Sequence, residues 1–520
     1  MTRTSYENAN TNLAGMMTPS LIAGALMILV WRCIRAWRQR LNFPILGSQS
    51  GANYADAVLE GHKKYPDSPF ILDTSPPRII MPMSMFKEAM HAPSKQLSFM
   101  RSIYATFQGR YTYVGTEIDD IIHAIRSDLT KRISDILPLL QNETEYCLEH
   151  AIGEATTWTS VPAYVTMVRM IAILSGRVFV GLPLSREEKW IQKTMNYTSD
   201  IGNLLRAAHN WNHVIRPFIL PFLPETRRVV RTLHEARELI QPVADEALRH
   251  HDEQGDVPVK AGLRGSFISW MMRYQSAEQR TAERTGINQM ILSFVALHTT
   301  SAAATFVLLD LAQRPEYIPP LRQEIEDVIR EEGWCMDENQ RRHLNKARFQ
   351  RMTKLDSFIK ESQRVNPLNI VEGWRVVLSD ITFSNGVKIP KGSNIAWPLW
   401  GVYNSESTAL FNREYNKAAD VPGPEVFDGF RFSKLRQFYQ TSGQKHSTVT
   451  TSEESLNFGH GPNSCPGRFF AIYEIKTILV NIILNYDFRL KDGKKPQHTT
   501  QQIYNSPDAS SILEFKRRIT

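Results

Sequence analysis

The sequence predicts a mainly α protein with a minor β component (α+β), and three observations support this fold class. Residues 143–254 contain one helical apolar pattern after another, broken only where prolines occur. Residues 285–313 continue apolar spacing of helical period over eight turns. The strand-like runs, by contrast, are as short as residues 70–72 and 78–81.

The remaining elements follow from local patterns along the chain. Helical spacing recurs in three further segments, at residues 54–65, 118–141 and 355–365. Pro367 disfavours helix at the residue before it, so the third of these helices should end near Asn366. Asn385-Gly386 predicts a hairpin turn between short strands. Residues 98–116 are rich in Gly, Tyr and Phe and have no helical period.

Size and composition describe a large folded protein. The chain has 520 residues, of which 42% are hydrophobic and 22% charged. Length alone suggests two domains, because single cores usually stop growing near about 250–300 residues. Its four cysteines, Cys33, Cys147, Cys335 and Cys465, are too scattered for a disulfide framework and indicate a reducing compartment.

The net charge of +8 is spread along the chain. No compact basic block with interleaved aromatic residues occurs, which argues against nucleic acid as a partner. The modest excess of positive charge suits an anionic membrane surface or an acidic redox partner better.

The N-terminus predicts a membrane anchor. Residues 13–31 are mostly apolar and about as long as a helix that crosses a bilayer. Four arginines follow at once: Arg32, Arg35, Arg38 and Arg40. The positive-inside rule then keeps the bulk of the chain cytoplasmic. The alternative is a cleaved signal peptide, in which positive charge precedes the apolar run instead of following it.

These features divide the chain into three parts. Residues 1–31 are expected to be a luminal tail and a single-pass transmembrane anchor, in the endoplasmic reticulum membrane. Residues 32–48 form a basic hinge stiffened by Pro44. Residues 49–520 are expected to form the large cytoplasmic part.

A loop with one cysteine organises the C-terminal part. Cys465 lies between Phe458-Gly459-His460-Gly461 and Gly467, ahead of a helical run at residues 469–484. One thiolate cannot build a zinc or iron–sulfur site, whereas haem iron accepts a single protein thiolate. Glycines let amide N–H groups approach the sulfur, and the helix directs its positive end toward it. The alternative is a small buried structural cysteine.

The pattern Phe458-x-x-Gly461-x-x-x-Cys465-x-Gly467 resembles the haem-binding loop of the cytochromes P450. The resemblance covers nearly the whole chain, and residues 298–301 and 465–471 look most like membrane-anchored fungal members of specialised metabolism. It implies a helix-rich single catalytic domain with a small mixed β-sheet, in which residues 98–116 are a flexible substrate-contacting loop. It also implies heme b (iron protoporphyrin IX) with Cys465 as its axial ligand.

The middle of the long helical segment carries adjacent threonines. Their hydroxyls tend to bond back to the preceding turn and can open the helix locally into a groove. In the resemblance, Thr299 matches the threonine that helps to deliver protons to dioxygen, and His298 replaces the family's acid. His298 titrates near neutrality and is a candidate proton relay, or else a satisfied structural histidine.

Three charged residues occur in the family's order. Glu361 and Arg364 share a helix face, and Arg431 follows later in the chain. Taken alone, such a pair is usually a solvated surface pair. The resemblance implies that the three residues are buried together as a structural core. The family usually has a proline where this chain has Gly429.

The resemblance also assigns residues to the haem propionates. Arg375 matches the usual guanidinium contact. Residues 122–126 lack the family's tryptophan but keep Arg126, with His123 as a second donor. The alternative for each is an ordinary exposed residue. Asn463 stands where a basic contact is usual, which leaves one propionate contact unassigned.

The function implied is a monooxygenase that inserts one atom of O2 into an apolar small molecule, a terpenoid or a terpenoid-derived compound. The candidates for the substrate wall, which are equally candidates for plain core, are Phe294, Leu297, Ile370 and Val371. No flavin or nicotinamide fingerprint occurs, so electrons should come from an NADPH-cytochrome P450 reductase, with cytochrome b5 as a further partner. A haem-thiolate isomerase or dehydratase that needs no reductase, and a non-catalytic haem sensor or lipid carrier, are the alternatives.

Overall fold

The computed structural model describes residues 42–47, 53–406, 417–439 and 446–519, together with Gly24, Met27, Val30, Thr408 and Phe411. Most of the predicted anchor and hinge, residues 1–31 and 32–48, lies outside the described residues. The three-part division of the chain therefore stays a prediction.

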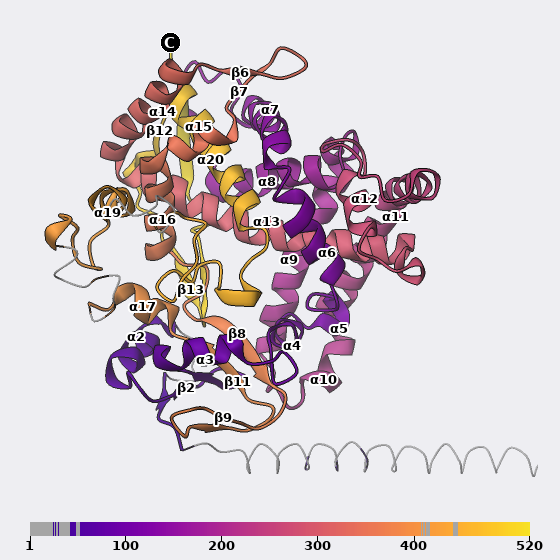
Figure 1. Ribbon diagram of the computed structural model, residues 1–520, viewed down its shortest axis with the longest axis vertical. Coiled ribbons are helices and arrows are strands. Elements are labelled where there is room, and N and C mark those ends of the chain that lie inside the picture. Colours follow the sequence, from indigo (N-terminus) through magenta and orange to yellow (C-terminus); the bar gives the residue numbers. More distant parts are fainter. Residues whose placement is uncertain are drawn as a thin grey trace, which may run out of the picture.

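Helices make up most of the described chain, as the sequence predicts (Figure 1). They are α2 (Ala55–Lys64), α3 (Phe86–His91), α4 (Phe99–Thr106), α5 (Gly109–Thr112), α6 (Asp119–Ala124), α7 (Ile133–Ile152), α8 (Ala163–Phe179), α9 (Glu188–His209), α10 (Arg216–Ile219), α11 (Pro224–Gln254), α12 (Ser266–Met272), α13 (Ala282–Gln313), α14 (Ile318–Glu332), α15 (Lys346–Arg351), α16 (Thr353–Val365), α17 (Leu399–Asn404), α19 (Arg431–Tyr439) and α20 (Arg468–Asn485).

The strands are short. They are β1 (Ile45–Leu46), β2 (Phe70–Leu72), β3 (Arg78–Ile80), β4 (Leu97–Ser98), β5 (Thr159–Pro162), β6 (Cys335–Met336), β7 (Arg342–His343), β8 (Glu372–Val377), β9 (Ile381–Thr382), β10 (Lys388–Ile389), β11 (Asn394–Trp397), β12 (Tyr486–Leu490), β13 (Thr499–Gln501), β14 (Tyr504–Ser506) and β15 (Ile512–Arg517). The largest sheet has the order β1-β2-β3-β11-β8-β4 and contains both parallel and antiparallel pairs, which is the small mixed sheet expected.

The helix α13 is the centre of the fold. It packs against α8, α9, α11, α16 and α20, and its buried side chains belong to the largest hydrophobic cluster. Among the described residues, it is the helix whose length and apolarity would suffice to cross a membrane. Its most apolar window is 78% buried inside the fold, which is typical of a core helix. α13 therefore runs through the interior of the helical layer.

Two local expectations are corrected. Residues 98–116, expected as a loop, contain the helices α4 and α5, and Ser98 caps α4 by accepting the backbone N–H of Arg101 at 3.2 Å. The helix expected over residues 118–141 is not continuous, because a π-helical turn, η2 (Ile125–Leu129), separates α6 from α7. The hairpin at Asn385-Gly386 is confirmed: β9 and β10 flank it, and Gly386 has a φ of +86°.

Candidate active site

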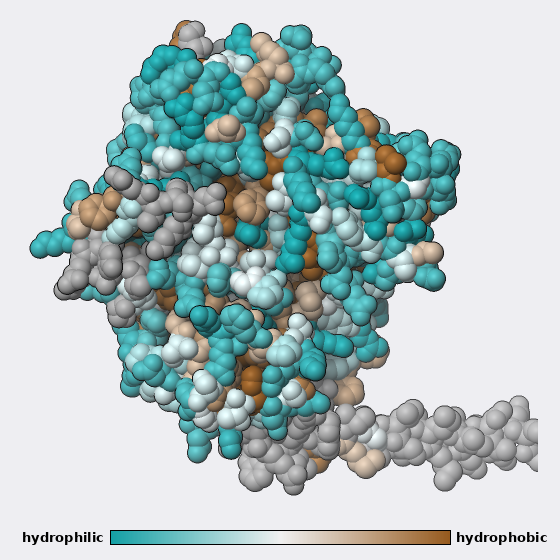
Figure 2. Space-filling model, in the orientation of Figure 1, coloured by the Kyte–Doolittle hydropathy of each residue, from teal (hydrophilic) through white to brown (hydrophobic). Residues whose placement is uncertain are grey.

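A large cavity lies between the helical layer and the main sheet. Its volume is about 1580 Å³, above the range of about 300–1,000 Å³ that is typical of small-molecule sites. Residues of α4, α13, β8 and β14 and of the cysteine loop line it. Figure 2 shows a mainly hydrophilic outer face, with hydrophobic residues visible in a hollow near its middle. The cavity has room for a large prosthetic group and a small molecule together.

Cys465 faces this cavity from the loop that precedes α20. Its backbone N–H donates to the carbonyl of Phe458 at 2.8 Å, which folds the loop back on itself. The backbone N–H groups of Gly467 and Arg468, where α20 begins, are hydrogen-bonded to the sulfur. Gly461 has a φ of +73°, a conformation that glycine adopts without strain.

The electrostatics of Cys465 are balanced between opposing effects. Burial raises the pKa of the thiol, while the N–H groups of Gly467 and Arg468 and the Arg468 charge favour the thiolate. A bound metal cation supplies the charge that removes a coordinating thiol's proton. Metal binding would therefore hold Cys465 in its thiolate form.

The surroundings of Cys465 fit a haem. A Cβ added to Gly467 would meet no atom within 4 Å, so open space adjoins the cysteine loop. Arg375, which is 3% exposed, also lines the cavity and donates to the Trp374 carbonyl at 2.8 Å and to Met90 Sδ at 3.2 Å. Within the described ranges no carboxylate forms an ion pair with it, and burial lowers its pKa to about 10. A prosthetic group with acidic side chains would supply the missing counter-charge.

The two other predicted propionate contacts lie outside the cavity lining. Arg126, on the π-helical turn η2, donates from Nη2 to the carbonyl of Pro462 at 2.9 Å and so ties this turn to the cysteine loop. His123 stacks on Tyr274, with ring centroids 5.5 Å apart. Asn463 does line the cavity. The geometry thus places Arg126 against the loop and His123 away from the site.

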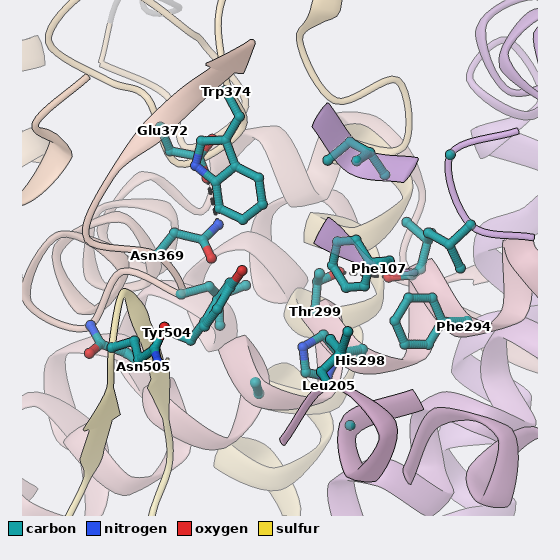
Figure 3. A pocket seen from close by; sticks show the side chains of 18 of the residues that line it. Phe107, Leu205, Phe294, His298, Thr299, Asn369, Glu372, Trp374, Tyr504 and Asn505 are labelled. Atoms are coloured by element: carbon teal, nitrogen blue, oxygen red, sulfur yellow. Dashed lines mark hydrogen bonds between the residues drawn. The ribbon is translucent and has the colours of Figure 1, made fainter. Parts of the chain in front are cut away.

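Thr299 and His298 face the cavity from the middle of α13 (Figure 3). Thr299 Oγ1 donates to the Val295 carbonyl at 2.9 Å, one turn earlier. α13 is nevertheless α-helical throughout Ala282–Gln313, so the expected local opening does not occur. The His298 ring stacks on Phe294, with centroids 5.8 Å apart and planes 6° apart. Burial lowers the pKa of His298, so the neutral imidazole is favoured.

The structure corrects the predicted substrate wall. Phe294 lines the cavity, but three other candidates do not and are at most 2% exposed: Leu297, Ile370 and Val371. Neighbouring residues face the cavity in their place: Val295, Leu368, Asn369 and Glu372. The reason is orientation, because an apolar side chain fits the core and a cavity wall equally well, and its direction depends on what packs against the segment.

Several lining residues carry no motif and were missed. They come from segments far apart in the sequence and include Phe107, Leu205, Trp374, Tyr504 and Asn505 (Figure 3). Of these missed positions, Glu372 could have been found from the sequence. An acidic residue beside an apolar strand needs a polar partner if it is buried, which indicates a polar site.

A buried ion trio joins α16 to α19. Arg364 Nε and Nη2 each donate to Glu361 at 2.8 Å, and Arg431 Nε lies 3.1 Å from both Glu361 oxygens. All three side chains are at most 1% exposed. Their remaining N–H groups donate to backbone carbonyls at residues 403 and 422–426. The charges are therefore paired and hydrogen-bonded, as burial requires.

Gly429, two residues before Arg431, is explained by packing. A Cβ there would lie 2.6 Å from a Phe358 ring atom and 2.8 Å from one of Tyr317. Its backbone N–H donates to the Tyr317 hydroxyl at 3.1 Å, a bond that proline cannot make. In this chain an aromatic cluster occupies the space that a side chain at position 429 would take.

Comparison with known proteins agrees with this geometry. The sequence model of the family described as "Cytochrome P450" matches residues 79–513. Cytochrome P450 monooxygenase 3 of Gibberella fujikuroi is 39% identical over 483 residues, covering 92% of this chain and 90% of the relative. Cytochrome P450 monooxygenase ascG of Acremonium egyptiacum is 35% identical, covering 96% of each chain.

A third relative is cytochrome P450 monooxygenase gliF of Aspergillus fumigatus, 33% identical over 92% of each chain. These relatives are fungal, and their family uses haem with an axial cysteine thiolate. Because the match extends over most of the sequence, the chain belongs to the cytochrome P450 family and is a haem-thiolate monooxygenase of the fungal group.

Proposed function

We propose that this enzyme inserts one oxygen atom of O2 into a terpenoid or a terpenoid-derived compound in fungal specialised metabolism. The observation that carries the proposal is that Cys465 and Thr299 face one cavity that Phe107, Phe294 and Trp374 also line. Thiolate-ligated haem, when bound, supplies the chemistry that activates dioxygen and oxidises an unactivated C–H bond. The protein's own residues hold the group, exclude water and move protons.

In this proposal Cys465 is the axial ligand. Phe458 lines the cavity beside Cys465, Gly461 supplies the left-handed turn of the loop, and Gly467 adjoins open space in which a Cβ would meet no atom within 4 Å. Arg375 pairs with a propionate, because its buried guanidinium has free donors and no acidic partner in the described ranges. Arg126 acts on the same site through the Pro462 carbonyl.

Proton delivery is assigned to α13. The Thr299 hydroxyl can accept one hydrogen bond while it donates another, so rotation away from the Val295 carbonyl turns its proton toward the cavity. The neutral His298 imidazole, one residue before it, can accept and release a proton in turn.

Electrons are proposed to come from an NADPH-cytochrome P450 reductase, with cytochrome b5 as a second donor. The enzyme is proposed to be anchored by residues 1–31 in the endoplasmic reticulum membrane, with residues 49–520 in the cytoplasm. The support is the apolar stretch at residues 13–31, followed directly by arginines. P450 monooxygenases in general draw electrons from a separate reductase.

The test combines a spectrum with isotope labelling. We expect the reduced enzyme with carbon monoxide to show the long-wavelength band of thiolate ligation, Cys465→Ser to lose it and Cys335→Ser to keep it. Terpenoid extracts incubated with reductase, NADPH and labelled oxygen gas should yield products that are heavier by one labelled oxygen. Retention of the band in Cys465→Ser, or a product that is unlabelled and independent of reductase, would contradict the proposal.

A further inference from the structure

One side of the cavity carries hydrogen-bonding groups and faces an aromatic wall. Asn369, Glu372 and Tyr504 line this side, and in Figure 3 they lie opposite Phe107 and Phe294. The rings of Phe107 and Phe294 meet edge to face, with centroids 5.7 Å apart. A molecule that spans the cavity therefore meets polar groups at one end and aromatic carbon at the other.

The polar side is held by paired backbone segments. Asn369 and Tyr504 are partners in an antiparallel bridge. The Ile370 N–H donates to the Ile503 carbonyl at 3.0 Å, next to that bridge. The positions of the two side chains are therefore fixed by main-chain hydrogen bonds and do not depend on a flexible loop.

Glu372 has spare hydrogen-bonding capacity. Its Oε1 accepts from Asn369 Nδ2 at 2.6 Å, and its Oε2 accepts a long bond of 3.3 Å from the Gly373 N–H. A carboxylate has about four acceptor sites, so about two remain on this cavity-lining side chain. In the described part of the chain no basic side chain lies within ion-pair distance of it, and desolvation raises its pKa to about 7.

Tyr504 offers the complementary donor. Its hydroxyl points into the cavity in Figure 3, and no described residue forms a hydrogen bond with it. The ring is positioned by Trp374, which it meets edge to face with centroids 5.9 Å apart. Burial raises the pKa of Tyr504 to about 12, so the hydroxyl keeps its proton at neutral pH.

The charges around this corner favour a neutral ligand. Arg78 is 7% exposed, lies over the Trp374 ring at 4.9 Å, and has two guanidinium nitrogens without a partner among the described residues. Arg78 and Arg375 both act on Glu372 through space. The Arg78 cation disfavours an ammonium group here, and the Glu372 carboxyl group repels an anion when it is ionised.

We infer that Glu372, Asn369 and Tyr504 form a polar anchor that binds a hydroxyl group of the substrate. Glu372 accepts a hydrogen bond from the hydroxyl group, Tyr504 donates a hydrogen bond to the hydroxyl oxygen, and Asn369 orients the Glu372 carboxyl group. This inference rests on the proposed function and narrows its substrate class to an apolar molecule that already carries an alcohol. An earlier hydroxylation or carbonyl reduction must supply such a substrate.

The anchor also gives a reason for regioselectivity. With its hydroxyl bound at one end, the apolar body of the substrate lies across the cavity toward Phe107 and Phe294, past Thr299 (Figure 3). The distance of a carbon from the anchored hydroxyl then decides which C–H bond is presented.

The test measures affinity in the haem-loaded, full-length enzyme with matched ligand pairs: geraniol, farnesol and geranylgeraniol, each beside its methyl ether. Dissociation constants are measured by absorbance titration and by calorimetry. At least one alcohol should have a dissociation constant about tenfold lower than that of its ether, because a good hydrogen bond typically contributes about that much to affinity. Glu372→Gln should reduce that preference to less than about threefold and leave ether binding unchanged, because only the alcohol has an O–H to donate. Tyr504→Phe should weaken the binding of alcohol and ether alike, because both oxygens accept from the Tyr504 hydroxyl.

Tyr164→Phe is the matched control. Tyr164 also lines the cavity, but its hydroxyl is already hydrogen-bonded to Ser301, so its loss should leave the alcohol preference intact. The inference is overturned if no alcohol outbinds its ether in the unsubstituted enzyme, if the preference survives in Glu372→Gln, or if Tyr504→Phe binds both ligands as tightly as the unsubstituted enzyme. The carbon monoxide band distinguishes failure of the haem-thiolate function from failure of the polar anchor. Its absence in the unsubstituted enzyme refutes the haem-thiolate function. Its presence without an alcohol preference refutes the anchor alone.

Discussion

Arg126 Nη2 donates to the carbonyl of Pro462 at 2.9 Å, three residues before Cys465. This bond joins η2 to the cysteine loop across 336 residues of sequence. A π-helical turn is rare and often marks a functional site. Here it brings a guanidinium with five donors to the edge of the haem site, where one donor fixes the loop and others stay available.

We therefore expect Arg126→Ala to loosen haem binding without unfolding the protein. The measurement is the rate of haem transfer to apomyoglobin, which should rise about tenfold, since charge-assisted hydrogen bonds contribute about 1.5–3 kcal/mol. Lys131→Ala is the control, because Lys131 is exposed and close in sequence. Equal transfer rates for both variants would show that the contact with Pro462 does not hold the site.

Thr299 and Thr300 offer an internal comparison for proton delivery. Thr299 faces the cavity, whereas Thr300 is 3% exposed. We expect Thr299→Ala to lower product formed per NADPH oxidised by on the order of 10-fold or more, since positioned proton transfer contributes about 10²–10⁴-fold. Thr300→Ala should keep normal coupling. If the two variants behave alike, a proton role for Thr299 is refuted.

The ion trio predicts a large stability effect. Glu361→Gln removes the charge between two buried guanidinium groups and leaves Arg364 and Arg431 uncompensated. The free energy of unfolding should fall by about 3–5 kcal/mol, as for other broken buried pairs. Urea unfolding followed by circular dichroism measures it. Asp327→Asn removes an exposed ion pair and should leave the midpoint unchanged. A similar midpoint in both variants would contradict the prediction.

Glu474 predicts a pH dependence. It is 0% exposed on α20, accepts from Ser175 Oγ at 2.7 Å, and its Oε2 has no partner among the described residues. Burial raises its pKa to about 8 from the ordinary value of 4.5. The folded protein therefore keeps a proton that the unfolded chain loses, so the free energy of unfolding falls as pH rises between these two values, by up to about 1.4 kcal/mol per pH unit.

Glu474→Gln should abolish this contribution. Relative to the variant, the unsubstituted protein should lose stability steadily from about pH 5 to about pH 8, as measured by urea unfolding at several pH values. Glu238→Gln, at a 70% exposed side chain, is the control and should show no such difference. Parallel stability curves for the unsubstituted protein and Glu474→Gln would mean that the buried carboxyl group is not held neutral.

Much of the site was predictable because its functional residues lie in short sequence motifs. The cysteine loop has a fixed spacing of glycines around Cys465, and α13 has an unbroken apolar pattern around Thr299. Glu361 and Arg364 are three residues apart on one helix. Such patterns can be recognised from the sequence because they depend on residues that are close together in the chain.

Other features were not predictable. The loop expected at residues 98–116 folds into helices, because capping by Ser98 and packing of its aromatic side chains outweigh the weak helical period. Leu297 and Ile370 are core residues, although their composition suits a cavity wall equally well. His123 stacks on Tyr274, which lies 151 residues later in the sequence, and no local pattern predicts this contact.

The sequence by itself determined the family, the metal-binding loop and the central helix, because each depends on residue types at fixed local spacing. Only the tertiary structure decided that Tyr504 stands beside Asn369 and Glu372, and which side of residues 368–372 faces the cavity. The physical reason is that long-range strand pairing and core packing set the direction of a side chain, and both depend on segments more than a hundred residues apart.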